Sequence, residues 1–309
     1  MQQVQPFSVE GNQIWFLNGT CNLLCNLWLH EDGFELKTYA LGCRALLLLR
    51  RPSDLGIAYS SLNQHFLFTS WLGSPRPVLG FGPPSDLRTT ALDWPFQDLT
   101  AVSAAAQGSE FVLICSGGSL CSIRAMVRFD ANFHGYQRQE VGNALGNQSE
   151  SLEGWILPQA IGLSEGIVLF SLATRLALCW VLNQEYYPVK LEIGEHSRLG
   201  PLGSDHLILL EHSGECASIA RIGRSGRMGE IACWKRVPWE LPHGVAMSSN
   251  RGLVVMDTSE ALFVKVAKSD TFVRIPPDMK LDGVHPLEGR YLKLSAQEGA
   301  DLSVGRSPQ

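Results

Sequence analysis

A pair of short apolar strands recurs seven times along the chain, and in every copy the second strand begins nine residues after the first. The first strands begin at Ile14, Ile57, Phe111, Ile167, Leu207, Leu253 and Tyr291, and the second at Leu23, Phe66, Leu120, Leu176, Cys216, Leu262 and Ala300. Loop length sets the register of a β-hairpin, and a slip of one residue would turn every side chain to the wrong face. The constant offset therefore predicts seven β-hairpins.

The rest of the chain also favours strands over helices. Apolar residues rarely recur with a helical period, whereas short Val, Ile, Leu, Phe and Trp runs broken by Gly, Ser, Asn, Asp and Pro continue throughout. Phe111–Ile114, a turn with two glycines, and Leu120–Ile123 form one such unit. Because many strands are apolar at every position, both of their faces must be covered, as in stacked sheets. The predicted class is all-β.

The spacing of the hairpins suggests an architecture. The first and last copies begin 277 residues apart, or about 46 residues per unit, which fits a four-stranded propeller blade. We therefore predict that residues 1–309 form a single seven-bladed β-propeller domain. The last copy has no room for an outer strand, and Gln2–Gln5 is predicted to supply it. Pairing of the N- and C-terminal strands would then close the ring and leave no open edge.

Further strands are predicted on both sides of the hairpins. Those that precede a hairpin are Val102–Ala106, Gln159–Leu163, Gly200–Gly203, Gly244–Ser248 and Gly283–Leu287. Those that follow one are Phe34–Leu41, Val78–Phe81, Val189–Ile193, Met228–Trp234 and Thr271–Ile275. Two longer gaps, residues 82–99 and 130–154, are interpreted as loops or insertions. Such loops lie on a face of a propeller, where function usually resides.

Two groups of residues are candidates for binding a partner. The local concentration of basic residues comprises Arg221, Arg224, Arg227, Lys235 and Arg236. Gly and Ser between its arginines suit a loop that meets phosphate or an acidic protein, and a solvated hairpin loop is the alternative. The second group is aromatic, with Trp94, Phe133 and Tyr136 near predicted loops. Interfaces favour Trp, Tyr and Arg, and packing between adjacent blades is the alternative for these rings.

Composition limits the environment and the partners. The chain carries 25 basic and 30 acidic residues, a formal net charge of −5, so direct nucleic-acid binding is not expected. No basic leader is followed by an apolar stretch, and no run approaches the roughly 18 apolar residues of a spanning helix, so no membrane contact is expected. Most of the eight cysteines lie in apolar segments. They are interpreted as reduced core residues of a cytoplasmic or nuclear protein.

Motifs that carry chemistry are missing. The sequence has no phosphate-binding loop, zinc-protease helix, paired C-x-x-C set or serine-hydrolase elbow. Cys21 and Cys25 are interpreted as structural, and His206 and His212, which flank an apolar strand, as hydrogen-bonded to neighbouring backbone. We predict no catalytic residue, no metal site, no cofactor and no small-molecule substrate.

The segment His206–Ile219 resembles the middle of a regulator-of-chromosome-condensation (RCC1-like) repeat. It has a His that opens the strand, alternating apolar residues, and Gly214 two residues before the next strand. Glu110–Ile123 keeps this spacing with Gly118, while Phe96–Ala104 and Trp239–Ala246 look like the segments that lead into such repeats. The resemblance implies a seven-bladed ring. No position matches the residues with which that family exchanges guanine nucleotides or binds histones, so those activities do not carry over.

Three functions remain open from the sequence. The first is a non-enzymatic platform that binds one or more proteins as a subunit of an intracellular complex. The second is an RCC1-like regulator that acts on a GTPase or a chromatin protein. The third is a propeller enzyme with its site at the central channel, for which the available side chains are Glu165, Asp205, Glu211, His243 and Asp257. These five do not recur at one position of the repeat, which favours the platform.

Overall fold

The computed structural model consists of β-strands, and no helix occurs among the residues that it describes. The described residues are 8–18, 23–40, 55–60, 62, 65–70, 78–81, 88–91, 93–117, 123–130, 135–141, 159–170, 176–182, 185–192, 196–226, 228–258, 261–275, 290–295 and 303–306. No described helix is long and apolar enough to span a membrane.

Strands β1 to β24 fall into six units of four, each an antiparallel meander in chain order. The first unit consists of β1 (Ser8–Glu10), β2 (Gln13–Asn18), β3 (Leu23–Leu29) and β4 (Gly33–Ala40). The second consists of β5 (Leu55–Ser60), β6 (His65–Ser70), β7 (Val78–Phe81) and β8 (Arg88–Ala91). The third consists of β9 (Thr100–Gln107), β10 (Glu110–Ser116), β11 (Ile123–Asp130) and β12 (Tyr136–Glu140). The fourth unit consists of β13 (Gln159–Leu163), β14 (Gly166–Phe170), β15 (Leu176–Leu182) and β16 (Glu185–Glu192). The fifth consists of β17 (Ser197–Leu202), β18 (His206–Ser213), β19 (Cys216–Ile222) and β20 (Met228–Trp234). The sixth consists of β21 (Pro242–Met247), β22 (Leu253–Asp257), β23 (Leu262–Lys265) and β24 (Val273–Ile275).

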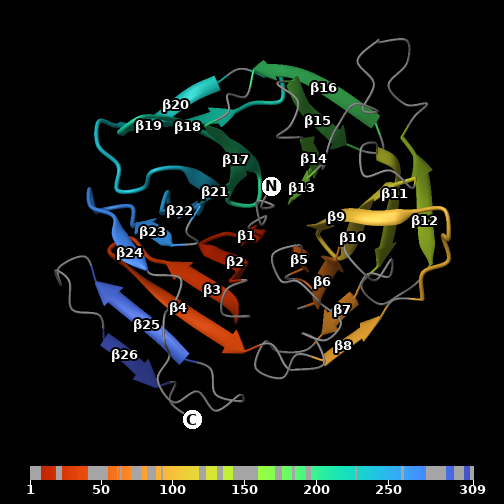
Figure 1. Cartoon of the computed structure of the whole chain (residues 1–309), viewed down its shortest axis with the longest axis horizontal. Helices are drawn as coiled ribbons and strands as arrows, with labels where there is room; N and C mark the ends of the chain where they lie inside the picture. The colour runs from red at the N-terminus through yellow and green to blue at the C-terminus, as the bar shows by residue number, and fades with distance from the viewer. Residues whose placement is uncertain are drawn as a thin grey trace.

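The six units are arranged as a ring, with the first strand of each toward the centre and the fourth at the rim (Figure 1). Four-stranded sheets around a common axis define a β-propeller. The predicted all-β class and propeller fold are therefore confirmed. Five of the first six predicted hairpins are found, with the first strand of each pair antiparallel to the second. In the third, β10 pairs antiparallel with β11, which begins at Ile123, and the predicted start at Leu120 lies outside the described residues.

The seventh predicted hairpin does not form a separate blade among the described residues. Its strands are β25 (Arg290–Ser295) and β26 (Ser303–Arg306). β25 pairs antiparallel with β4, from Arg290 opposite Thr38 to Ser295 opposite Gly33. The hairpin thus extends the first unit to a six-stranded sheet, and seven separate blades are not confirmed. The N- and C-terminal parts of the chain do share a sheet, but through β4, since Gln2–Gln5 lies outside the described residues.

The sixth unit contacts the first directly. The backbone N–H of Ser249 donates to the carbonyl oxygen of Gly11 over 2.9 Å, and the N–H of Asn250 donates to Oδ1 of Asn12 over 3.0 Å. Nδ2 of Asn250 donates to the carbonyl oxygen of Leu29 over 2.9 Å. Side chains from both units, such as Leu27 and Val254, share one apolar core. The ring therefore closes between these two units without a blade between them.

Apolar cores lie between adjacent units, and strands such as β10 are buried on both faces, as their continuous apolar sequences predict. Near the axis the inner strands nearly touch. A Cβ atom on Gly162 would lie 1.8 Å from the carbonyl oxygen of Ala106, and one on Gly200 would lie 1.9 Å from that of Val245. Glycine at these two positions allows the close approach of neighbouring inner strands.

Two segments interpreted from the sequence as loops each contain a strand. β8 lies within residues 82–99 and β12 within residues 130–154. Both are outermost strands of their units and pair with a neighbour on one side only. The side chains of β12 (YQRQE) are half-buried or exposed, so its sequence has no apolar alternation that would mark a strand. Of the predicted flanking strands, Gly283–Leu287 lies outside the described residues.

The cysteines divide into two kinds. Cys25 and Cys115 are free and buried, as predicted, and burial raises the pKa of the Cys115 thiol. Cys216 and Cys233 are free but exposed, which corrects their interpretation as core residues. Both lie near an end of the fifth unit, where its sheet is no longer covered by its neighbours.

Candidate functional site

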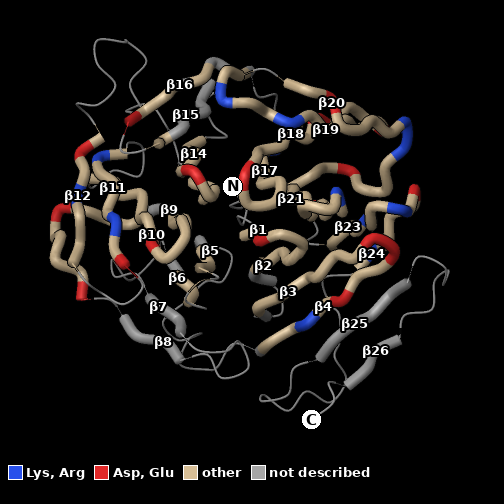
Figure 2. Tube along the Cα trace, turned by 180° about the vertical axis from the view of Figure 1, so that it is seen from behind, with Lys and Arg blue, Asp and Glu red and all other residues tan. Residues whose placement is uncertain are grey.

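The basic residues predicted to form one group are separated in the structure. Arg221 and Arg224 lie where β19 turns toward β20, whereas Lys235 and Arg236 follow the far end of β20. β20 has seven residues, so the two pairs are about 20 Å apart at the rise of a β-strand. Arg224 forms an ion pair with Glu165 of the fourth unit, and Arg227 lies outside the described residues. Figure 2 likewise shows Lys and Arg at separate places along the fifth unit.

Two of the three predicted aromatic residues do lie together. Trp94 and Tyr136 pack edge to face, with ring centroids 6.1 Å apart, and Phe96 packs against both rings. Trp94 is only 8% exposed, so most of its ring packs within the propeller. Phe133 lies outside the described residues.

These rings hold the segment 93–99 against the third unit. The indole N–H of Trp94 donates to the backbone carbonyl oxygen of Leu99 over 3.1 Å. The hydroxyl of Tyr136 donates to the backbone carbonyl oxygen of Asp93 over 2.9 Å. The segment leads into the innermost strand β9, while Tyr136 lies on the outermost strand β12. The contacts therefore connect the centre of the blade to its rim.

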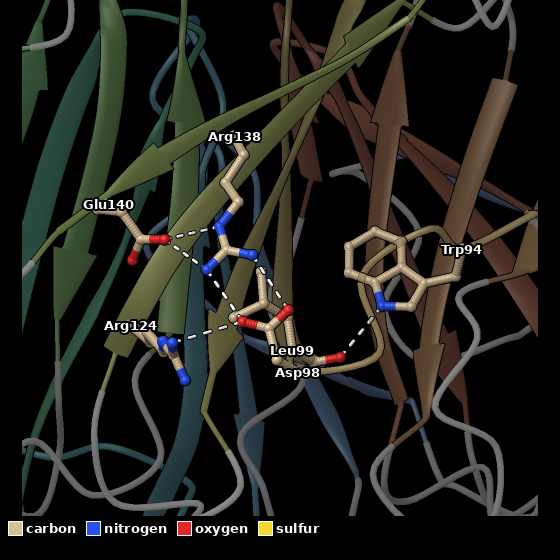
Figure 3. Close-up of polar contacts among 6 residues, drawn as sticks. All are labelled: Trp94, Asp98, Leu99, Arg124, Arg138 and Glu140. Atoms are coloured by element: carbon tan, nitrogen blue, oxygen red, sulfur yellow. Dashed lines mark hydrogen bonds and ion pairs between the residues drawn. The ribbon is translucent and has the colours of Figure 1, made fainter.

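A network of charged side chains lies beside the aromatic rings (Figure 3). Nη1 and Nη2 of Arg138 donate to the two carboxylate oxygens of Asp98 over 3.1 and 3.0 Å, and Nε donates to Glu140 over 2.7 Å. Arg124 approaches Asp98 to 3.5 Å from β11. The Arg138 guanidinium carbon lies 5.6 Å from the centroid of the Phe96 ring. We call Phe96, Asp98, Arg124, Tyr136, Arg138 and Glu140 the blade-3 patch.

The charges of this patch are fixed in place yet accessible to solvent. The side chains of Asp98, Arg124 and Glu140 are all between 44% and 49% exposed, and that of Arg138 is 26% exposed. The hydrogen bond from Arg138 is the main reason why the pKa of Asp98 lies below its usual range. A permanently ionised carboxylate is a poor general acid or base at neutral pH. Asp98 is therefore placed to act through its charge rather than through proton transfer.

Three of the side chains considered for a central-channel enzyme form hydrogen bonds or ion pairs with other residues of the propeller. Asp205 accepts a hydrogen bond from Ser164, Glu165 pairs with Arg224, and Asp257 accepts one from the backbone N–H of Ala261 over 3.1 Å. No group of three or more His, Cys, Asp or Glu side chains within the described ranges is placed to hold a metal ion. Among these residues, no two candidates form a catalytic pair.

The polar members of the patch were not predicted from the sequence. Asp98 and Glu140 fall in the two segments interpreted as loops, and Arg124 and Arg138 are isolated along the chain. A possible signal is the alternation of Arg138 and Glu140 in the YQRQE segment, which places both side chains on one face if the segment is a strand. That Asp98 is the hydrogen-bond partner of Arg138 could not be predicted from the sequence, because the fold brings the two residues together.

Comparison with known protein families finds no match for the chain, and none of the curated proteins matches its sequence. Solved structures do match. YCF48 from Cyanidioschyzon merolae is 8% identical with a TM-score of 0.51, over 96% of this chain and 95% of that one. A gluconolactonase from Xanthomonas campestris is 12% identical with a TM-score of 0.49, over 94% and 92% of the two chains. YCF48 bound to a D1 peptide is 11% identical with a TM-score of 0.47, over 81% and 80%.

At these identities the likeness is one of fold alone. The similarity to YCF48 from Cyanidioschyzon merolae supports the β-propeller seen in the strand pairing. None of the three structures points to RCC1-like repeats, so that resemblance stays a prediction from the sequence.

Proposed function

We propose that the chain is a non-enzymatic interaction platform that binds one or more proteins, and that the blade-3 patch is a docking surface. The observation that carries the proposal is the network of Asp98, Arg124, Arg138 and Glu140 beside packed aromatic rings. Arginine is enriched at the energetic centres of protein interfaces, and a side chain held in place loses little entropy on binding. Carboxylates and guanidinium groups side by side select a partner with complementary charges.

The arrangement of the other charged groups supports a non-enzymatic role. Asp205, Glu165 and Asp257 each have a hydrogen-bond or ion-pair partner within the propeller. An RCC1-like regulator acting on a GTPase or a chromatin protein is the alternative carried by the sequence resemblance. Either function uses a rigid ring whose rim presents fixed side chains.

Affinity purification of the tagged full-length chain, followed by mass spectrometry, tests the platform. We expect at least one stoichiometric protein partner, and its affinity should fall about 30-fold or more in an Arg124→Glu variant, because truncation or reversal at an interface centre costs about 2 kcal/mol or more. Arg124 is about half exposed and contacts only Asp98 within the patch, so its reversal should leave the fold intact.

Arg236→Glu is the matched control. Arg236 is 92% exposed on the fifth unit and lies 4.0 Å from Glu215. The variant should retain the partner. Loss of the partner with Arg236→Glu and retention with Arg124→Glu would move the interface to the basic residues predicted from the sequence. Absence of any stoichiometric partner would contradict the platform itself.

A further inference from the structure

A cavity of about 410 Å³ opens in the fifth unit, at the end where β18 turns into β19. Ser197, Glu211, His212, Cys216, Ser218 and Cys233 are among the residues that line it. Its volume lies within the range of about 300–1,000 Å³ that is usual for small-ligand sites. None of its lining residues belongs to the blade-3 patch, so the cavity is a separate site.

Strand register builds the polar wall of this cavity. Ser197 is opposite Glu211, Glu211 is opposite Ser218, and Ser218 is opposite Cys233, so these four residues form one row across β17, β18, β19 and β20. Residues opposite one another point to the same face of a sheet.

The next residues of β17 and β18 on this face of the sheet, two positions away from the polar row, are apolar. There Leu199 lies opposite Leu209, and both belong to the core shared with the fourth unit. The change from apolar to polar side chains therefore coincides with the end of the apolar core. A cavity left by imperfect packing would be lined by the apolar side chains instead.

The lining carries one charged hydrogen-bond acceptor. Glu211 supplies a carboxylate, and no lysine or arginine occurs among the described lining residues. His212 is 8% exposed, and its Nε2 has no hydrogen-bond partner in the described part of the chain. The sequence predicted a hydrogen bond from His212 to nearby backbone, and Nε2 does not make one.

His212 follows Glu211 along β18, so its side chain lies on the opposite face of the sheet. Burial, and to a lesser extent the neighbouring His196, lower the pKa of His212 below its usual value of 6.5. A neutral imidazole has one nitrogen that accepts a hydrogen bond, whereas an imidazolium has none. On the face of the polar row, the cavity thus combines the Glu211 carboxylate with the hydroxyls of Ser197 and Ser218.

We propose that this cavity binds a guanidinium group, carried by a small molecule or by an arginine of another protein. A guanidinium has five N–H donors in a planar fork that matches a carboxylate. Charge-assisted hydrogen bonds to Glu211 would supply affinity, and the remaining donors would face the hydroxyls of Ser197 and Ser218 in the same row. Arg198, whose Nη1 donates to the carbonyl oxygen of Ser197 over 2.7 Å, is not among the lining residues, and Arg236 lies beside Glu215.

Two native thiols provide the test. Cys216 and Cys233 are exposed and line the cavity, whereas Cys25 and Cys115 are buried elsewhere. The rate of iodoacetamide alkylation at Cys216 and Cys233 is measured by mass spectrometry in the full-length chain, with and without arginine amide. A probe concentration of about twice its Kd should slow alkylation about three-fold by occupancy. Citrulline amide, which is planar but uncharged, should give no protection.

Glu211→Gln and Glu215→Gln form a matched pair of variants. Only Glu211 lines the cavity, although both carboxylates lie at the same end of the fifth unit. Loss of the charge-assisted contact should weaken protection by arginine amide about ten-fold or more in Glu211→Gln. Glu215→Gln should behave as the wild type.

The outcomes separate the possible ligands. Stronger protection by the peptide Gly-Gly-Arg-Gly-Gly than by arginine amide assigns the site to a protein arginine, and the reverse assigns it to a small guanidino compound. Equal protection by citrulline amide, equal protection in Glu211→Gln, or no protection by any probe overturns the proposal. Because the readout needs no protein partner, its failure leaves the interaction platform standing.

Discussion

Replacement of Gly200 by alanine tests whether the inner strands of neighbouring units touch near the axis. A Cβ atom at this position would lie 1.9 Å from the carbonyl oxygen of Val245 and 2.7 Å from its carbonyl carbon. Both are backbone atoms of β21, and β21 is held on its other side by β22, where Val245 is opposite Val255. The clash can therefore be relieved only by shifting an inner strand of the ring.

The expected loss of stability is large for the addition of one methyl group. Overpacking costs about 1–3 kcal/mol, and a rigid backbone neighbour places Gly200→Ala at the upper end of that range. At roughly 2 °C per kcal/mol for a chain of this size, the melting temperature should fall by roughly 5 °C. The assay is thermal unfolding followed by circular dichroism, with urea unfolding as a second measure of the free energy.

Gly229→Ala is the matched control. Gly229 lies within β20, and a Cβ atom there would meet nothing within 4 Å. Both substitutions reduce the conformational entropy of the unfolded chain by the same amount, and this alone stabilises the folded state by about 0.4–1 kcal/mol. The difference between them therefore isolates the steric contact. Equal melting temperatures for the two variants would refute the close packing of the inner strands.

Three further predictions concern ring closure and pH. Asn250→Ala removes the hydrogen bond to the carbonyl oxygen of Leu29 and should cost about 1–3 kcal/mol in urea unfolding; an unchanged midpoint would count against closure at this contact. Because the pKa of Asp98 is lowered mainly by its hydrogen bond from Arg138, the stabilisation is present at neutral pH and is lost as the pH falls below the usual value of 3.8. Arg138→Gln should therefore unfold with a weaker acid dependence in that range, and an identical profile would show that the bond does not contribute. Because burial lowers the pKa of His212, the unfolded chain takes up that proton first, and stability should fall as the pH drops below 6.5. His212→Gln should flatten the decline in melting temperature between about pH 7 and 5, and an unaltered slope would contradict the assignment.

Local sequence patterns were sufficient to predict the strand pairs but not the number of blades. The offset of nine residues identifies the hairpins because turn length and register are local properties. The hairpin that begins near Tyr291 has the same offset, yet β25 pairs with β4 at the edge of the first unit. That pairing joins residues more than 250 positions apart, and no local pattern distinguishes it from the start of a new blade.

The candidate site was predictable only in part, for a related reason. Trp94 and Tyr136 were identified as aromatic residues near loops, and they pack together. Asp98 and Arg138 were not, because their hydrogen bonds form between a connecting segment and a polar edge strand. The basic residues Arg224 and Lys235 are close in sequence but lie at opposite ends of β20, so their separation depends on the length of that strand.

Zero-length crosslinking of the native chain tests the central claim most directly, that the sixth unit closes the ring onto the first. Nζ of Lys268, between β23 and β24, lies 2.5 Å from Oε2 of Glu31, between β3 and β4. A carbodiimide should therefore join these two side chains in the monomer, and peptide mass spectrometry should recover the crosslinked pair. If a seventh blade stood between the two units, these side chains would be out of reach, and the absence of this crosslink would contradict direct closure of the sixth unit onto the first.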